Sequence, residues 1–232
     1  MERIPTGVVG LNQLLRGGVP AGSMVLVIGA PGAGKSTLGK QFLFDSLAKE
    51  KPAVLVDTFE SLEVAKETMA SFEWSGPLLD NIIFLDCYSW RTGVVRQRYS
   101  ASPKNLTDMN LVLSDLLKNE IGVGSRARLV IDSFSDVIMH AGAAQAQKFL
   151  DTLKAKLAES RVTSMVMLEA GVHEEKVNAA IEYVTDGTIK MQYEERGRSL
   201  MVSRMLGTPV TIKWIPFTLS QGIEVAVANY FS

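Results

Sequence analysis

Residues 24–37 read MVLVIGAPGAGKST, and this stretch decides the fold. Its first five residues, Met24–Ile28, form a short apolar run of the kind that becomes a buried parallel strand. The next eight, Gly29–Ser36, match the pattern G-x-x-x-x-G-K-[ST], and a helical pattern follows over Lys35–Ala48. A strand, a glycine-rich loop and a helix in this order predict a phosphate-binding loop.

The residue types of the loop suit a polyphosphate. Gly32 and Gly34 allow backbone N–H groups to turn towards the ligand at points where side chains would clash. Lys35 supplies a positive charge to the terminal phosphates, and the hydroxyl of Ser36 can bind Mg²⁺. We therefore expect ATP and Mg²⁺ as cofactors, with ADP as the other nucleotide. The residues expected to hold the nucleotide are Gly29, Ala30, Pro31, Gly32, Ala33, Gly34, Lys35, Ser36 and Thr37.

A second apolar strand, expected over Leu129–Ile131, leads directly into an acidic residue. Asp132 stands where a carboxylate completes the Mg²⁺ shell in proteins with such a loop, the Walker B pattern. An aspartate at the end of a strand can also merely cap the following helix. With the loop present, we assign Asp132 and Ser36 as the metal-binding residues. Ser133 is either a supporting hydroxyl or a helix cap.

The rest of the chain alternates between apolar runs and amphipathic patterns. Further strands are expected at Ala53–Val56, Ile82–Leu85 and Val162–Leu168, and further helices at Ser61–Phe72, Leu106–Glu120 and Gln145–Glu159. Runs that are apolar on both faces indicate parallel strands covered by helices. Strands that alternate with helices predict an α/β sheet with right-handed crossovers.

The C-terminal part has a different pattern. Thr188–Tyr193 and Leu200–Met205 flank the charged turn EERGR and predict a β-hairpin. Short strands are expected around Ile212–Leu219 and Ile223–Val227. We interpret them as an antiparallel extension of the same sheet, so that residues 1–232 form a single domain. The unassigned segment Cys87–Lys104 is long for a structureless loop and is therefore expected to be functional or mobile.

Composition excludes several classes of protein. The chain has 232 residues, of which 47% are hydrophobic, so it can bury a sizeable core. A formal net charge of -1 gives no general attraction to nucleic acid or anionic membranes. Cys87 is the only cysteine, so an intramolecular disulfide is impossible. The N-terminus lacks a signal-peptide pattern and the apolar runs are too short to span a bilayer, so we expect a cytoplasmic protein.

Several segments together resemble a known family. The segment TGVVGLNQLLRGGVPAGSMVLVIGAPGAGKSTLGKQFLFDSL is similar to the entry segment of KaiC-like ATPases of the RecA/RadA superfamily, and LVIDSFSDVI resembles their Walker B strand. MLEAGVHEE, VTDGTIKMQY and SRMLGTPVTIKWIPFTLSQGIEV resemble their later strands, so the likeness runs from Thr6 to Val225. It implies a RecA-type core, ATP at a subunit boundary, and a homo-oligomeric ring or filament.

The strand after the phosphate loop departs from the family pattern. KaiC-like proteins resemble one another in a pair of glutamates that follows a phenylalanine, the first of which activates water. Here the segment VLVDTFES keeps a single glutamate. Aligned through Phe59 and Glu60, the resemblance makes Glu60 the catalytic base. Aligned without a gap on Asp57 and Thr58, it places Phe59 in the catalytic position and leaves Glu60 as a helix-capping carboxylate.

The segment expected to act on a neighbouring subunit also differs from the family pattern. The family strand K-x-R-G-[ST] carries a lysine and an arginine that reach the neighbour's γ-phosphate. Here Arg204 keeps a cation at the first position, and Leu206 replaces the arginine. Because a missing arginine finger costs about 10³–10⁵ in rate, we expect slow hydrolysis, with Arg204 as a catalytic residue in trans. Glu182 and Tyr183 replace the Ser-Thr pair that KaiC phosphorylates, which disfavours autophosphorylation there.

The leading hypothesis is therefore an ATP-binding, slowly hydrolysing KaiC-like ATPase whose nucleotide state controls assembly or partner binding. One alternative is a nucleotide-binding regulator without significant hydrolysis, because of Phe59 and Leu206. Another is a DNA-repair accessory protein that resembles the RadA paralogues, because segment 91–104 mixes aromatic and basic residues. Nucleic acid is not favoured as a partner, since Glu169 and Glu174 would repel phosphates in the loop where recombinases hold DNA.

Overall fold

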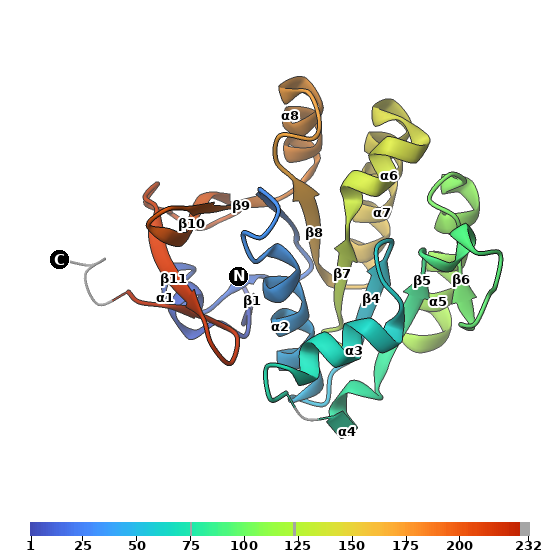
Figure 1. Ribbon diagram of the computed structural model, residues 1–232, viewed down its shortest axis with the longest axis horizontal. Helices are drawn as coiled ribbons and strands as arrows, with labels where there is room; N and C mark the ends of the chain where they lie inside the picture. The colour runs from blue at the N-terminus through green and yellow to red at the C-terminus, as the bar shows by residue number, and fades with distance from the viewer. Residues whose placement is uncertain (75, 123, 228–232) are drawn as a thin grey trace.

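The computed structural model describes residues 1–74, 76–122 and 124–227, and its centre is a ten-stranded sheet (Figure 1). The strand order is β12-β11-β10-β9-β3-β8-β7-β4-β5-β6. The strands from β9 to β6 in this order run parallel, whereas β10, β11 and β12 pair antiparallel at one edge. This confirms the predicted fold class, a mostly parallel sheet with an antiparallel C-terminal extension.

The strands are β3 (Met24–Gly29), β4 (Ala53–Asp57), β5 (Ile82–Asp86), β6 (Tyr99–Ser100), β7 (Arg128–Asp132), β8 (Thr163–Glu169), β9 (Gly187–Glu194), β10 (Gly197–Met205), β11 (Ile215–Leu219) and β12 (Ile223–Val225). The helices are α1 (Val9–Leu14), α2 (Lys35–Leu47), α3 (Leu62–Ala70), α4 (Gly76–Leu79), α5 (Leu106–Glu120), α6 (Phe134–Ala141), α7 (Ala143–Glu159) and α8 (Glu175–Val184). A short pair, β1 (Arg3–Ile4) and β2 (Val19–Pro20), lies near the N-terminus.

Helices cover both faces of the parallel strands. On β3, Val25 and Val27 belong to the core shared with α2 and α3, whereas Met24 and Leu26 face the core formed with α5, α6, α7 and α8. Because successive side chains of a strand point to opposite faces, a strand that is buried on both faces reads as a continuous apolar run. The two cores therefore explain the apolar runs seen in the sequence.

Most predicted elements are present, and the differences are local. The predicted strands lie in β3, β4, β5, β7 and β8, and the hairpin is β9 and β10. The strand expected over Ile212–Leu219 begins only at Ile215, and segment 87–104 is not structureless, because it contains a 3₁₀ turn at Ser89–Arg91 and the short strand β6. No bounds were predicted for helices α1, α4, α6 and α8.

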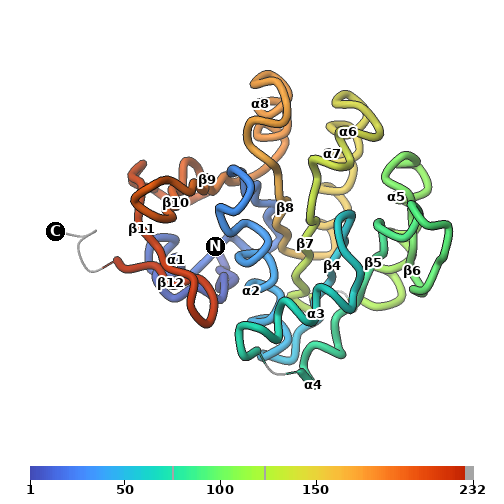
Figure 2. Tube along the Cα trace, viewed as in Figure 1, coloured from blue at the N-terminus to red at the C-terminus, as the bar shows by residue number. Residues whose placement is uncertain are grey.

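The N-terminal segment packs against the C-terminal extension. Figure 2 shows α1 beside β12, although the two are far apart in the sequence. A side chain at Gly10 of α1 would collide with the backbone of Val225, so this glycine allows the two elements to approach. Within the ranges that the structure describes, no helix is long and apolar enough to cross a membrane.

Candidate functional site

The carboxyl ends of the central strands gather at one edge of the sheet. Strands β4 and β7 pair in register there, so Asp57 lies directly opposite Asp132. Ligands of open parallel α/β sheets bind at this edge. A cavity of about 200 Å³ lies there, lined by Ser36, Lys40, Asp57, Phe59, Glu60, Thr68, Asp132, Ser133 and Glu169.

The predicted phosphate loop joins β3 to α2. Gly32 and Gly34 have φ angles of 76° and 98°, which favour glycine, and Gly34 caps the first turn of α2. Lys35 begins the helix and is buried. Its Nζ donates to the carbonyl of Ala30 at 3.0 Å and forms an ion pair with Oε2 of Glu169 at 2.7 Å. The sequence analysis considered Glu169 as a charge that repels nucleic-acid phosphates, and here its carboxylate contacts the loop lysine.

The predicted metal-binding residues lie together. Ser36 and Asp132 both line the cavity, and burial raises the pKa of Asp132. Ser133 caps α6, because its Oγ accepts a hydrogen bond from the N–H of Ser135 at 3.2 Å. Of the two roles considered for Ser133, the cap is therefore the one that the geometry shows.

Asp57 adds a second buried carboxyl group that the sequence analysis did not assign. Its Oδ1 accepts hydrogen bonds from the N–H groups of Phe59 and Glu60 at 2.7 and 2.9 Å, whereas its Oδ2 is buried without a partner among the described residues. Burial, and then the charge of Asp132, raises the pKa of Asp57 to about 8. The signal in the sequence was its place at the end of an apolar run, now β4.

These groups fit a hydrated divalent cation. Two carboxyl groups with raised pKa values and one unpartnered oxygen indicate negative charge that a cation would stabilise. Among the described residues, no group of three or more His, Cys, Asp and Glu could enclose a metal. Mg²⁺ suits such a site, because it keeps several waters and takes only one or two protein carboxylates together with phosphate oxygens.

Glu60 and Phe59 differ in where their side chains lie. The side chain of Phe59 is largely exposed, at 71%, whereas that of Glu60 is only 22% exposed and forms an ion pair with Lys40. Both residues line the cavity, but Phe59 carries no group that could accept a proton. Of the two residues, Glu60 is therefore the one whose carboxylate can act on a ligand bound there.

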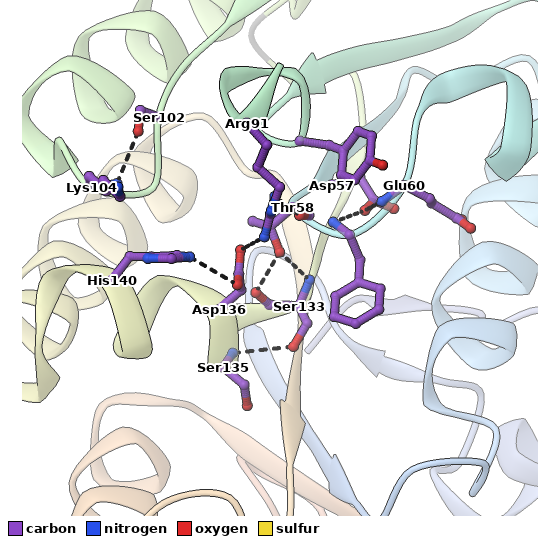
Figure 3. Close-up of polar contacts among 12 residues, drawn as sticks. Asp57, Thr58, Glu60, Arg91, Ser102, Lys104, Ser133, Ser135, Asp136 and His140 are labelled. Atoms are coloured by element: carbon purple, nitrogen blue, oxygen red, sulfur yellow. Dashed lines mark hydrogen bonds and ion pairs between the residues drawn. The ribbon is translucent and has the colours of Figure 1, made fainter. Parts of the chain in front are cut away.

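Arg91 connects the site to α6. Its guanidinium donates to the carbonyl of Thr58 at 2.7 Å and to Oδ2 of Asp136 at 2.8 Å, and Asp136 also lies 3.3 Å from Nε2 of His140 (Figure 3). The contacts join the segment that follows β4 to the helix that follows Asp132. Arg91 therefore holds the two chain segments that carry Glu60 and Asp132.

Trp90, in the aromatic and basic segment 88–104, is surrounded by cationic side chains and a second ring. The ring of Trp90 has the ammonium of Lys104 at 4.5 Å, the guanidinium of Arg91 at 5.0 Å and the ring of His140 at 5.0 Å from its centroid. A base-stacking surface needs an open aromatic face. The surroundings of Trp90 therefore give no support to the reading of this segment as a single-strand nucleic-acid surface.

Two arginines of β10 lie in different places. Arg204 is not among the residues that line the cavity of its own chain, and its guanidinium donates to the carbonyls of Glu182 and Thr185 at the end of α8. Its expected role at a neighbour's nucleotide stays a prediction. Arg198, which the sequence analysis did not single out, donates from Nε to the carbonyl of Gly32 at 3.0 Å and lies over the ring of Tyr193. It therefore braces the phosphate loop within the chain.

Comparison with known proteins gives consistent similarities. The family model described as ATPase, KaiC, matches residues 4–229. A UPF0273 protein of Pyrobaculum aerophilum is 30% identical over 99% of this chain and 84% of its own, and one of Pyrococcus furiosus is 28% identical over 97% and 94%. A crystal structure of a KaiC-like protein from Pyrococcus horikoshii has a TM-score of 0.78 at 24% identity, covering 97% of this chain and 99% of that one.

The pKa of Asp57 predicts how stability depends on pH. A carboxyl group whose pKa is higher in the folded protein stabilises it fully below its unfolded pKa, about 4, and this contribution is lost as the pH rises towards about 8. Without nucleotide and Mg²⁺, the free energy of unfolding should therefore fall between pH 5 and pH 8. Asp57→Asn should flatten this slope and gain on the order of 2 kcal/mol at pH 8. Urea denaturation of both proteins at the two pH values tests this, and identical slopes would contradict it.

Proposed function

The chain belongs to the KaiC family of ATPases, and from this premise we propose that it binds Mg²⁺-ATP, hydrolyses it slowly, and changes its assembly or partner binding with its nucleotide state. One observation carries the proposal: Ser36, Glu60 and Asp132, from three separate segments, line one cavity next to the phosphate loop. A loop alone binds phosphate, whereas these added groups are what hydrolysis needs.

Each residue has a part in the proposed reaction. The loop and Lys35 bind the phosphates and fix their position, and Lys35 would exchange Glu169 for a phosphate oxygen. Ser36 and Asp132 would hold Mg²⁺, which neutralises the charge of the phosphates when bound. Glu60 orients a water molecule and accepts its proton. Arg91 keeps the segments that carry Glu60 and Asp132 in place.

We expect slow turnover because the segment that would reach a neighbouring subunit's nucleotide lacks one of the two cations of the family pattern. Leu206 stands where the family pattern has an arginine, and its side chain is exposed rather than part of the core. Arg204, the remaining cation, must leave the carbonyls at the end of α8 to reach a neighbour. A site with one trans-acting cation in place of two stabilises the charge of the transition state less well.

Lys35→Ala tests the assignment of the phosphate loop. Loss of the charge should weaken Mg²⁺-ATP binding at least about 100-fold, which corresponds to about 2.7 kcal/mol. Lys176→Ala is the matched control, because this exposed lysine pairs with Glu174 on the surface. Titration calorimetry measures both, with melting temperatures alongside because Lys35 is buried against Glu169. Unchanged affinity in folded Lys35→Ala protein would refute the assignment.

The Glu60→Gln variant distinguishes between two hypotheses, an enzyme that hydrolyses ATP and a regulator that only binds it. The amide keeps the size and the hydrogen bonding of the side chain, so ATP affinity should stay within a few-fold of the parent. Hydrolysis should fall about 10²-fold, because general-base catalysis contributes about that much. Phosphate release at saturating Mg²⁺-ATP gives the result. Equal rates for parent and variant would instead favour the nucleotide-binding regulator.

Assembly should depend on the nucleotide. The segment after β10 exposes the apolar side chains of Leu206, Ile212 and Trp214, which we expect a second copy of the chain to cover. Since ATP bound only in the assembled state shifts association by mass action, Mg²⁺-ATP should favour oligomers. Sedimentation of the Glu60→Gln protein with and without Mg²⁺-ATP measures this while ATP persists. A monomer in both samples at high concentration would rule out the proposal.

A further inference from the structure

Lys40 is a buried cation of the cavity that the phosphate-loop pattern does not contain. It lies on α2 one helical turn after Ser36, and its side chain is only 4% exposed. Its Nζ forms an ion pair with Oε1 of Glu60, and its charge also acts on Asp132. Lys40 therefore lies among the acidic groups at the ends of β4 and β7.

The surroundings of Glu60 show why its side chain lies in the cavity. Its N–H is fixed by Oδ1 of Asp57, which determines where the side chain leaves the backbone. Asp57 and Asp132 would repel a third carboxylate in this space. The ammonium of Lys40 is the attraction that offsets this repulsion, because it bonds to the Glu60 carboxylate directly.

The ion pair leaves Glu60 able to act on a ligand. A carboxylate has two oxygens with about four lone pairs, and the contact with Lys40 engages one oxygen. A buried ammonium stays in place only while it keeps a charged partner, so each member fixes the other. The same side chain without a partner could turn out to solvent, as the neighbouring Phe59 does.

We propose that Lys40 is a positioning residue for ATP hydrolysis. Its ammonium holds the Glu60 carboxylate inside the cavity beside Asp132, with the second oxygen directed to accept the proton of the attacking water. The inference rests on the proposed hydrolysis and deepens it. It also assigns Lys40 a second effect, because a fixed positive charge in an acidic cavity weakens the binding of free divalent cations.

Lys40→Met, Lys40→Arg and Lys40→Gln test the proposal. Lys40→Met should lower kcat about 10-fold or more with little change in the Kd for Mg²⁺-ATP, and Lys40→Arg should restore much of the rate because it keeps the cation. The double variant with Glu60→Gln should be no slower than Glu60→Gln alone, since both changes remove one interaction. Lys40→Gln, similar in length and uncharged, replaces Lys40→Met if the latter does not fold.

A second measurement needs no turnover. Free Mn²⁺, followed by its spin-resonance signal, should bind the nucleotide-free Lys40→Met protein about fivefold more tightly than the parent, because a positive charge leaves the cavity. Lys66→Met is the control, since Lys66 pairs with Asp80 on the surface and should change neither rate nor Mn²⁺ affinity.

The outcomes separate this inference from the proposed function. A parent protein without Mg²⁺-dependent turnover overturns both. A parent with turnover and a Lys40→Met variant of equal or higher kcat overturns the role of Lys40 alone. The role of Lys40 alone is also overturned if the double variant is slower than Glu60→Gln by the full factor that Lys40→Met causes in the parent. An unchanged Mn²⁺ affinity of the Lys40→Met protein overturns it as well.

Discussion

Two buried carboxyl groups on adjacent strands are the constraint on which the site depends. The register of β4 and β7 places Asp57 opposite Asp132, and burial raises the pKa of both groups. Two negative charges buried this close together are stable only if a cation lies beside them or if one of the carboxyl groups is protonated. The cations around it, the hydroxyl of Ser36 and the phosphate loop are therefore parts of one electrostatic arrangement.

Two lysines of α2, Lys35 and Lys40, bring positive charge to this site, and each is paired with a different carboxylate. Lys35 is held by Glu169 from β8, and Lys40 is held by Glu60 from the segment after β4. Each pair joins α2 to the end of a different strand, so the positions of the strand ends and of the helix are coupled through charge. A ligand that displaces one partner of a buried pair must itself supply the missing charge, and a phosphate can do this for Lys35.

Much of the fold could be predicted from the sequence, because its strands are buried on both faces and read as apolar runs. Ser133 was considered as a helix cap, but no bounds were predicted for helix α6, because its eight residues bury the continuous run Phe134–Ile138 and show no amphipathic burial pattern. Helix α8 was missed because it contacts the core through only two buried residues, Ile181 and Val184. Local patterns are weak where a helix touches the core along a short stripe.

The sequence likewise predicts some residues of the candidate site and misses others. The loop, Ser36 and Asp132 follow from a pattern of fixed spacing, so the sequence suffices. The sequence does not show which of the side chains of Phe59 and Glu60 turns into the cavity. Hydrogen bonds from their N–H groups to Asp57 fix the backbone there, and no sequence motif predicts these bonds. Lys40 and Arg198 were missed because a lysine in a helix and an arginine in a hairpin are common on surfaces, and only tertiary contacts distinguish them.

The most direct measurement is a crystal structure with Mg²⁺ and a non-hydrolysable ATP analogue. The account predicts that the phosphates lie in the loop with Lys35 on the terminal phosphate, that Ser36 contacts the metal, and that Glu60 still faces the cavity beside Lys40. A nucleotide bound away from the loop, or a Glu60 side chain turned out to solvent while the phosphates lie in place, would contradict it.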